Sequence, residues 1–140
     1  EAITVGATDS QDYVADYSNT GTCVDLFAPG SIIYSTVGTG TRAISLSGTS
    51  MSSPMVAGAV ALLKEELGDV SVSQIRSTLA SRATTGTIRF ASDGSPDLLL
   101  YVSSDSSSSD PAPPSGSSRG AQFETAVLLG LIVVILWHST

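Results

Sequence analysis

The 140-residue sequence is poor in cysteine, histidine and basic residues. It contains one cysteine, one histidine, and six lysines and arginines against 13 aspartates and glutamates, which gives a formal net charge of −7. Because the few basic residues form no cluster, nucleic acid is not an expected partner. The acidic composition, rich in Ser, Gly and Thr, is typical of an exported protein. The sequence contains no visible internal repeat.

The sequence also lacks an initiator methionine, a signal peptide and a long hydrophobic run. Because it begins at Glu1, we expect it to be the C-terminal part of a longer protein. Its final apolar run, residues 126–137, spans about 12 residues, whereas a membrane-spanning helix needs roughly 20. No Lys or Arg follows this run, so the positive flank of a typical membrane span is missing.

The most informative stretch is residues 47–58, where small and hydroxyl-bearing residues lead into an apolar segment. Gly, Ser and Thr favour turns and helix caps, and Pro54 is tolerated in the first turn of a helix. The pattern predicts a tight turn and then a helix, with Ser50 at or just before the first turn. A hydroxyl there lies near unpaired backbone N–H groups and the positive end of the helix dipole. This setting suits a nucleophile whose attack creates an oxyanion, although a plain helix cap fits the same pattern.

The Gly-Thr-Ser-Met-x-x-Pro sequence at residues 48–54 resembles the nucleophile motif of the subtilisin-like serine proteases, and most closely that of the proteinase K-like group. Further matches follow in order along residues 1–102. They are Ala-Ile-Thr-Val-Gly-Ala at 2–7, Tyr-Ser-Asn at 17–19, Gly-Thr-Cys-Val-Asp-Leu-Phe-Ala-Pro-Gly at 21–30 and Gly-Ser-Pro-Asp-Leu-Leu-Leu-Tyr at 94–101. Several ordered matches are far more specific than one hydroxyl-rich turn. One departure is Met55, where the family usually has a histidine that is not the triad base.

The resemblance implies that Ser50 is the nucleophile of an Asp/His/Ser triad and that its backbone N–H contributes to the oxyanion hole. We interpret Thr49 and Met51 as positioning residues. The family's Asp and His precede the serine in their own motifs, and neither motif occurs here. The single histidine, His138, lies beyond the globular region and is a poor candidate for the base. The chemistry requires no cofactor.

Two further sites are implied by the resemblance. Asp25 and the carbonyl of Ala2 match positions that hold a structural Ca²⁺ in some proteinase K-like enzymes, and oxygen donors suit that ion. A strand-end aspartate satisfied by backbone N–H groups or by an unrelated partner is an equally good interpretation. Cys23 matches a cysteine that some of these enzymes bridge to an upstream cysteine. The alternative is a buried free thiol beside apolar neighbours.

Hydrophobic patterning predicts short strands and two helices, in agreement with the α/β class. The first helix, residues 51–67, has few polar residues before Lys64, so we expect it to be buried. Ser71 and Gln74 form a predicted capping box for the second helix, residues 71–83, whose Arg-bearing face is expected to be solvated. The predicted strands are residues 2–6, 23–27, 32–36, 43–46 and 98–102, and a glycine turn makes the third and fourth an antiparallel hairpin.

The composition divides the chain into three predicted regions. By the family resemblance, residues 1–102 are expected to form the C-terminal part of a three-layer α/β peptidase domain with a mainly parallel sheet. Residues 103–125 form a Ser- and Pro-rich flexible linker with too little apolar content to fold. Residues 126–140 form a hydrophobic tail. Small residues at Ser115, Gly116 and Ser117, a spacer and a terminal apolar run follow the order of a GPI-attachment signal. A short membrane span and a buried tail are the alternatives.

These expectations lead to two functional hypotheses. The first is a secreted, surface-anchored serine endopeptidase acting on proteins or peptides, of which this chain alone would be inactive because it lacks the Asp and the His. The second is a catalytically inactive surface module that retains the fold for binding or structure.

Overall fold

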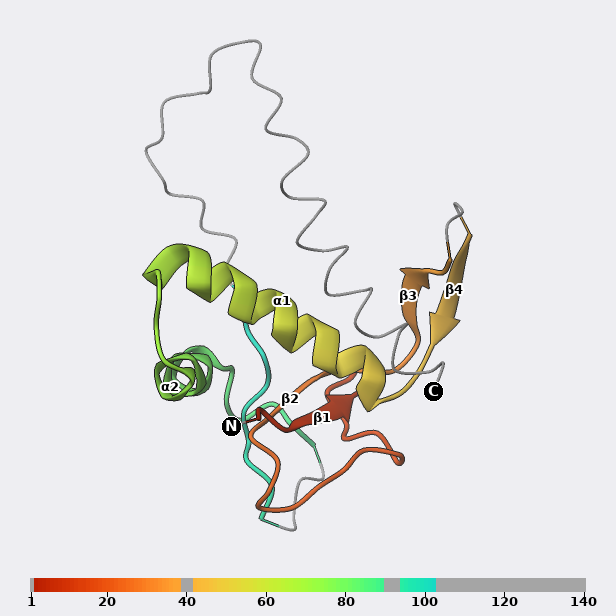
Figure 1. The fold of residues 1–140 in the computed structure, drawn as a ribbon. Coiled ribbons are helices and arrows are strands. Elements are labelled where there is room, and N and C mark those ends of the chain that lie inside the picture. The colour runs from red at the N-terminus through yellow and green to blue at the C-terminus, as the bar shows by residue number, and fades with distance from the viewer. Residues whose placement is uncertain (1, 39–41, 90–93, 103–140) are drawn as a thin grey trace, which may run out of the picture. The chain divides into compact units, whose positions relative to one another are not determined.

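Figure 1 shows the computed structural model of the chain, which describes residues 2–38, 42–89 and 94–102. The described elements are four strands and two helices. They are β1 (Val5–Thr8), β2 (Leu26–Pro29), β3 (Ile33–Thr36), β4 (Ala43–Leu46), α1 (Thr49–Leu67) and α2 (Val72–Arg82). The predicted linker, tail and lipid-attachment residues lie outside the described residues. No helix in the described part of the chain is long and apolar enough to cross a bilayer.

Strands β1 and β2 pair in parallel, with Val5 opposite Leu26 and Thr8 opposite Pro29. All four residues of β1 and the first three of β2 are buried, as expected for strands of a covered parallel sheet. Both strands begin later than the predicted residues 2–6 and 23–27. The reason is local, because the Thr4 N–H donates to the Asp25 side chain at 2.7 Å instead of joining the strand ladder.

Strands β3 and β4 form the predicted antiparallel hairpin, with Ile33 opposite Leu46 and Thr36 opposite Ala43. Gly38 in the connection has φ of 66°, a backbone conformation that glycine adopts without steric cost. The hairpin exposes large apolar side chains. Tyr34 is 75% exposed and Leu46 is 44% exposed.

Helix α1 lies against β1 and β2 (Figure 1). Its buried apolar residues are Val56, Ala59 and Leu63. These side chains join Leu26, Ala28 and others in one core, and burial of each large apolar side chain contributes roughly 1.5–3 kcal/mol. The expectation that α1 is buried all round is wrong for the described residues. Ala57, Gly58, Ala61 and Leu62 are exposed, because the described strands and α2 contact only one side of the helix.

Helix α2 begins with the predicted capping box. The Ser71 N–H donates to the Gln74 side chain at 2.9 Å, and the Gln74 N–H donates to the Ser71 hydroxyl at 3.3 Å. Ile75 and Leu79 are buried and extend the core that α1 begins. The predicted start of this helix is therefore confirmed, whereas Val72, the first apolar residue of the helix, is 42% exposed.

The predicted last strand, residues 98–102, is wrong as a strand. Leu99 makes only isolated bridges, parallel to Phe27 and antiparallel to Thr84. Phe27 donates its N–H to Leu98 and accepts from Leu100, both at 2.8 Å. The segment therefore lies beside β2, but each pairing is too short to form a strand.

Candidate active site

Ser50 is the second residue of α1, and its side chain is exposed. The residue that caps the helix is Gly48, and no side chain makes a cap hydrogen bond there. Ser50 is therefore not the helix cap. Its hydroxyl makes no hydrogen bond to any described residue, and it lies where the first N–H groups of the helix have no intrahelical acceptor. This arrangement leaves the Ser50 hydroxyl and the Ser50 N–H free for a reacting group, whereas the Met51 N–H donates to the Gly48 carbonyl at 2.9 Å.

Three hydrogen bonds hold the turn that carries Ser50 against the end of β2. The Gly48 N–H donates to the Gly30 carbonyl at 2.9 Å. The Ser52 hydroxyl, which is fully buried, donates to the Ala28 carbonyl at 3.0 Å. The Ile32 N–H donates to the Ser47 hydroxyl at 2.9 Å. The nucleophile candidate is therefore fixed by a rigid strand end rather than by a loose loop.

Gly30 is the residue that allows this close approach. A Cβ at residue 30 would lie 2.4 Å from Ser52 Oγ, 2.7 Å from Ala7 Cβ and 2.9 Å from the Gly48 carbonyl. Real Cβ atoms do not approach other atoms so closely, so a larger residue would push the start of α1 away from β2. Only glycine fits without moving the turn.

Ile32 introduces backbone strain two residues beyond Gly30. Its φ is 57°, in the left-handed region that a β-branched side chain rarely adopts. Its side chain is 69% exposed, so burial does not compensate for the strain. The hydrogen bond from its N–H to the Ser47 hydroxyl holds this conformation in place.

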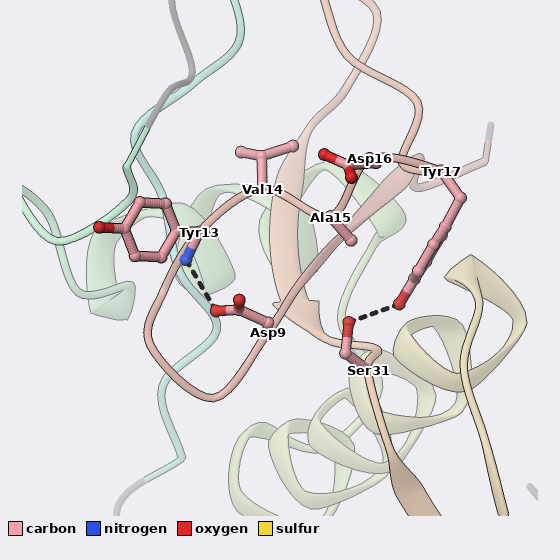
Figure 2. Close-up of a pocket in the computed structure, with 7 residues that line it drawn as sticks. All are labelled: Asp9, Tyr13, Val14, Ala15, Asp16, Tyr17 and Ser31. Carbon is pink, nitrogen blue, oxygen red and sulfur yellow. Dashed lines mark hydrogen bonds between the residues drawn. The ribbon is translucent and has the colours of Figure 1, made fainter.

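An open, partly polar pocket of about 550 Å³ lies beside the same strand end. Its lining residues, drawn in Figure 2, are Asp9, Tyr13, Val14, Ala15, Asp16, Tyr17 and Ser31. The Tyr17 hydroxyl donates to the Gly30 carbonyl at 2.9 Å and lies 2.6 Å from the Ser31 hydroxyl. Because Gly30 also accepts from Gly48, the wall of the pocket and the turn that carries Ser50 share one carbonyl.

The other wall of this pocket is stiffened by Arg89. Its guanidinium lies 5.1 Å from the centroid of the Tyr13 ring and donates to the Tyr13 hydroxyl at 3.3 Å. This hydrogen bond, followed by charge attraction, raises the pKa of Arg89. The Asp9 side chain accepts the Gln11 and Tyr13 N–H groups at 2.8 and 3.0 Å and so closes the loop between them.

The remaining predicted residues around Ser50 are partly buried. Thr49 and Met51 flank it in the first turn, and Met55 packs against the core, in agreement with a filling role. Ser53 donates its hydroxyl to the Thr49 carbonyl at 3.0 Å and takes no part in the contact with β2. The described residues include no histidine, so no general base lies near Ser50 within them.

The calcium hypothesis requires Ala2 and Asp25 to share one cation. In the structure both of them contact the guanidinium of Arg76 in α2. The Arg76 Nη2 donates to the Ala2 carbonyl at 2.6 Å, and its Nε lies 3.5 Å from Asp25 Oδ1. Asp25 Oδ2 accepts the Thr4 N–H. The donor oxygens thus face a guanidinium and an amide, an arrangement that does not fit a calcium ion. It matches the alternative in which backbone N–H groups and another partner satisfy Asp25.

Cys23 is a free, exposed cysteine, so the alternative of a buried thiol is wrong. It lies before β2, ahead of the buried residues Val24 and Leu26. The apolar neighbours in the sequence point into the core, whereas the thiol does not. A disulfide to a cysteine elsewhere in the protein stays a prediction.

The chain belongs to the subtilase family, whose model matches residues 1–118. It is 48% identical over 102 residues to an extracellular serine proteinase of Thermus sp. (strain Rt41A), covering 72% of this chain and 25% of that protein. It is 46% identical over 103 residues to alkaline serine exoprotease A of Vibrio alginolyticus, covering 74% and 19% respectively. The chain thus spans about a quarter or less of these relatives.

A solved structure gives the same family. A cold-adapted subtilisin-like serine proteinase is 42% identical and superimposes with a TM-score of 0.69, over 74% of this chain and 37% of that one. The predicted family and the α/β fold class are therefore confirmed.

Sequence reasoning predicts Ser50 as the candidate nucleophile but missed the residues that hold its turn against β2. Ser47, Ser52 and Gly30 lie in stretches that the motif analysis treated only as turn formers. A signal for Ser52 was present, because a hydroxyl two residues after Ser50 falls on the inward side of a helix beginning at residue 49. Nothing in the sequence pattern marked Arg76 as a partner of Asp25.

Proposed function

We propose that this chain supplies the nucleophile-bearing part of a secreted serine endopeptidase. The support is the exposed, unbonded hydroxyl of Ser50 at the uncapped start of α1, within a motif of the family to which the chain belongs. Asp and His from another part of the protein would complete the triad, and the chain alone would be inactive. The substrates are proteins or peptides.

The reaction follows from this placement. The Ser50 oxygen attacks the carbonyl carbon of a peptide bond while the histidine takes its proton, and the carbonyl oxygen becomes an oxyanion. The Ser50 N–H, at the open end of α1, donates to that oxyanion. The C–N bond then breaks, the histidine gives its proton to the leaving amine, and water releases the acyl group from Ser50. Thr49 and Met51 set the position of the hydroxyl in this scheme.

Labelling of the full-length protein with a fluorophosphonate probe tests this proposal. Wild-type protein is expected to be labelled, and Ser50→Ala is expected to lose labelling completely because the probe bonds to the serine oxygen. Ser53→Ala is the matched control, since its hydroxyl lies in the same turn but bonds only to the Thr49 carbonyl. Unchanged labelling of Ser50→Ala removes Ser50 from its role, and no labelling of the wild type favours the inactive surface module.

The proposal extends to how the protein is held outside the cell. Residues 103–125 form the stalk and residues 126–140 the tail, with GPI attachment at Ser115, Gly116 or Ser117. Mass spectrometry of the mature protein tests this part, because a GPI-anchored form lacks residues 126–137. Detection of those residues in the mature protein contradicts GPI attachment and leaves a short membrane span or a buried tail.

A further inference from the structure

The corner formed by Ala2 and Asp25 is where the family resemblance places a structural calcium ion, and the structure places Arg76 there. We propose that the guanidinium of Arg76 acts as the permanent cation of this corner, so that no metal ion is bound between Ala2 and Asp25. The proposal concerns the stability of the fold and does not depend on the role of Ser50.

The contacts of Arg76 support this assignment. Its Nη2 donates to the Ala2 carbonyl at 2.6 Å, and its Nε forms an ion pair with the Asp25 carboxylate at 3.5 Å without a hydrogen bond. The second carboxylate oxygen accepts the Thr4 N–H at 2.7 Å. A calcium ion in this place would need those same oxygens turned toward it, together with enough others to make six to eight ligands.

Charge leads to the same conclusion. Asp25 is the carboxylate of the corner, and an ion pair with Arg76 already balances it. A divalent ion bound beside the guanidinium would be repelled by it, since Arg keeps its charge at any working pH. The Arg76 guanidinium and a calcium ion would therefore compete for the same position beside Asp25.

The corner is also shielded on one side. The Nε of Arg76 is buried and has no hydrogen-bond partner, although the Arg76 side chain as a whole is 41% exposed, and the Asp25 side chain is 24% exposed. The other ion pair of α2, between Arg82 and Glu66, has side chains that are 44% and 52% exposed. Arg76 ties α2 to the segments that lead into β1 and β2, whereas Arg82 only joins α2 to the end of α1. Loss of Arg76 should therefore weaken the fold more than loss of Arg82.

The experiment measures thermal midpoints of the full-length protein in Ca²⁺ and in EDTA. A Ser50→Ala background prevents self-cleavage from affecting the midpoints. Arg76→Met is expected to lower the midpoint by about 3 °C or more in both media, and the matched Arg82→Met by about 1 °C or less. Asp25→Asn is expected to keep the same calcium-dependent shift as its parent, whatever other calcium sites the protein has.

Either of two results overturns the proposal. The first is a smaller calcium-dependent shift in Asp25→Asn than in the parent, which places a calcium ion on Asp25. The second is an Arg76→Met midpoint that is unchanged or raised in Ca²⁺, which shows that the guanidinium is not the cation of the corner. If Asp25→Asn does not fold, the Arg76→Met comparison decides the question alone.

Discussion

Helices α1 and α2 both begin in serine-containing turns, but they use their hydroxyls in opposite ways. At α2 the Ser71 hydroxyl accepts the Gln74 N–H, and the Gln74 side chain accepts in return, so the helix start is closed. At α1 the cap residue is Gly48, which has no side chain, and the Ser50 hydroxyl is left exposed. A capping hydroxyl is unavailable for chemistry, and an uncapped helix start leaves donors for a developing negative charge.

Two hydroxyls near Ser50 hold the start of α1 against the end of β2 instead of capping the helix. Ser47 and Ser52 bond to the chain around the end of β2, and Ser53 bonds within the helix. Hydrogen bonds to the end of β2 therefore fix the start of α1, whereas hydrogen bonds between neighbouring residues of the helix start fix the start of α2. Disturbing β2 should affect the candidate site, and disturbing the capping box should affect only stability.

The largest expected effect comes from Gly30→Ala. The added Cβ collides with Ser52 Oγ, Ala7 Cβ and the Gly48 carbonyl, so the turn must move. We expect a loss of about 1–3 kcal/mol in the free energy of unfolding and roughly 100-fold slower fluorophosphonate labelling in the full-length protein. Ser31→Ala, at the adjacent residue, is the control and should label at nearly the wild-type rate. Normal labelling of Gly30→Ala would mean that β2 does not position the turn.

Ser71→Ala is the matching change at α2. It removes the hydroxyl of the capping box, and we expect a loss of about 1 kcal/mol in the free energy of unfolding by urea denaturation. Fluorophosphonate labelling should stay unchanged. Ser50→Ala should show the reverse, with labelling lost and the urea midpoint unchanged. Equal losses of stability in both variants would contradict the contrast between the two helix starts.

A smaller effect is expected from Ile32→Asn. Asparagine tolerates positive φ better than a β-branched residue, and the backbone N–H that bonds to Ser47 is retained. We expect the protein to become more stable by about 0.5–1 kcal/mol, measured by urea denaturation. A destabilised variant would indicate that the exposed Ile32 side chain is covered by another part of the protein.

The smallest effect concerns pH and the far end of α1. The hydrogen bond from Arg82 lowers the pKa of Glu66 below its ordinary value of 4.5. The stabilisation from this pair is therefore complete above pH 4.5 and is lost as the pH falls through the lower pKa of the folded state. The difference in thermal midpoint between the wild type and Glu66→Gln should be small at pH 7 and should shrink as the pH is lowered below 4.5. A constant difference across this range would show that Glu66 acts through something other than its charge.

Local structure could be predicted from the sequence where it depends only on residues of the same helix or hairpin. The capping box and the hairpin depend on residues close together in the sequence, and both predictions are confirmed. The placement of Ser50 in the first turn of α1 follows from the same kind of local signal. Sequence reasoning failed for contacts between distant residues, because propensity and periodicity contain no information about which segments meet.

Three contacts illustrate this limit. Leu99 was assigned to a strand, but its partners are Phe27 and Thr84. Arg76 was assigned to a solvated face, but it reaches back to Ala2 and Asp25. Helix α1 was expected to be buried, yet the described elements cover only one side of it. The apolar composition of α1 favours burial but does not identify the segments that would cover it.

The bonds between Phe27 and the segment at Leu98–Leu100 also affect how the molecule assembles. They join residues about 70 positions apart, and closing so long a loop is slow because the chain must lose much conformational freedom first. During synthesis, β2 can gain this neighbour only after the ribosome has released residue 100. Until then one side of β2 is open to pairing with other chains. This edge is where a translational pause or a bound chaperone would have its greatest influence on yield.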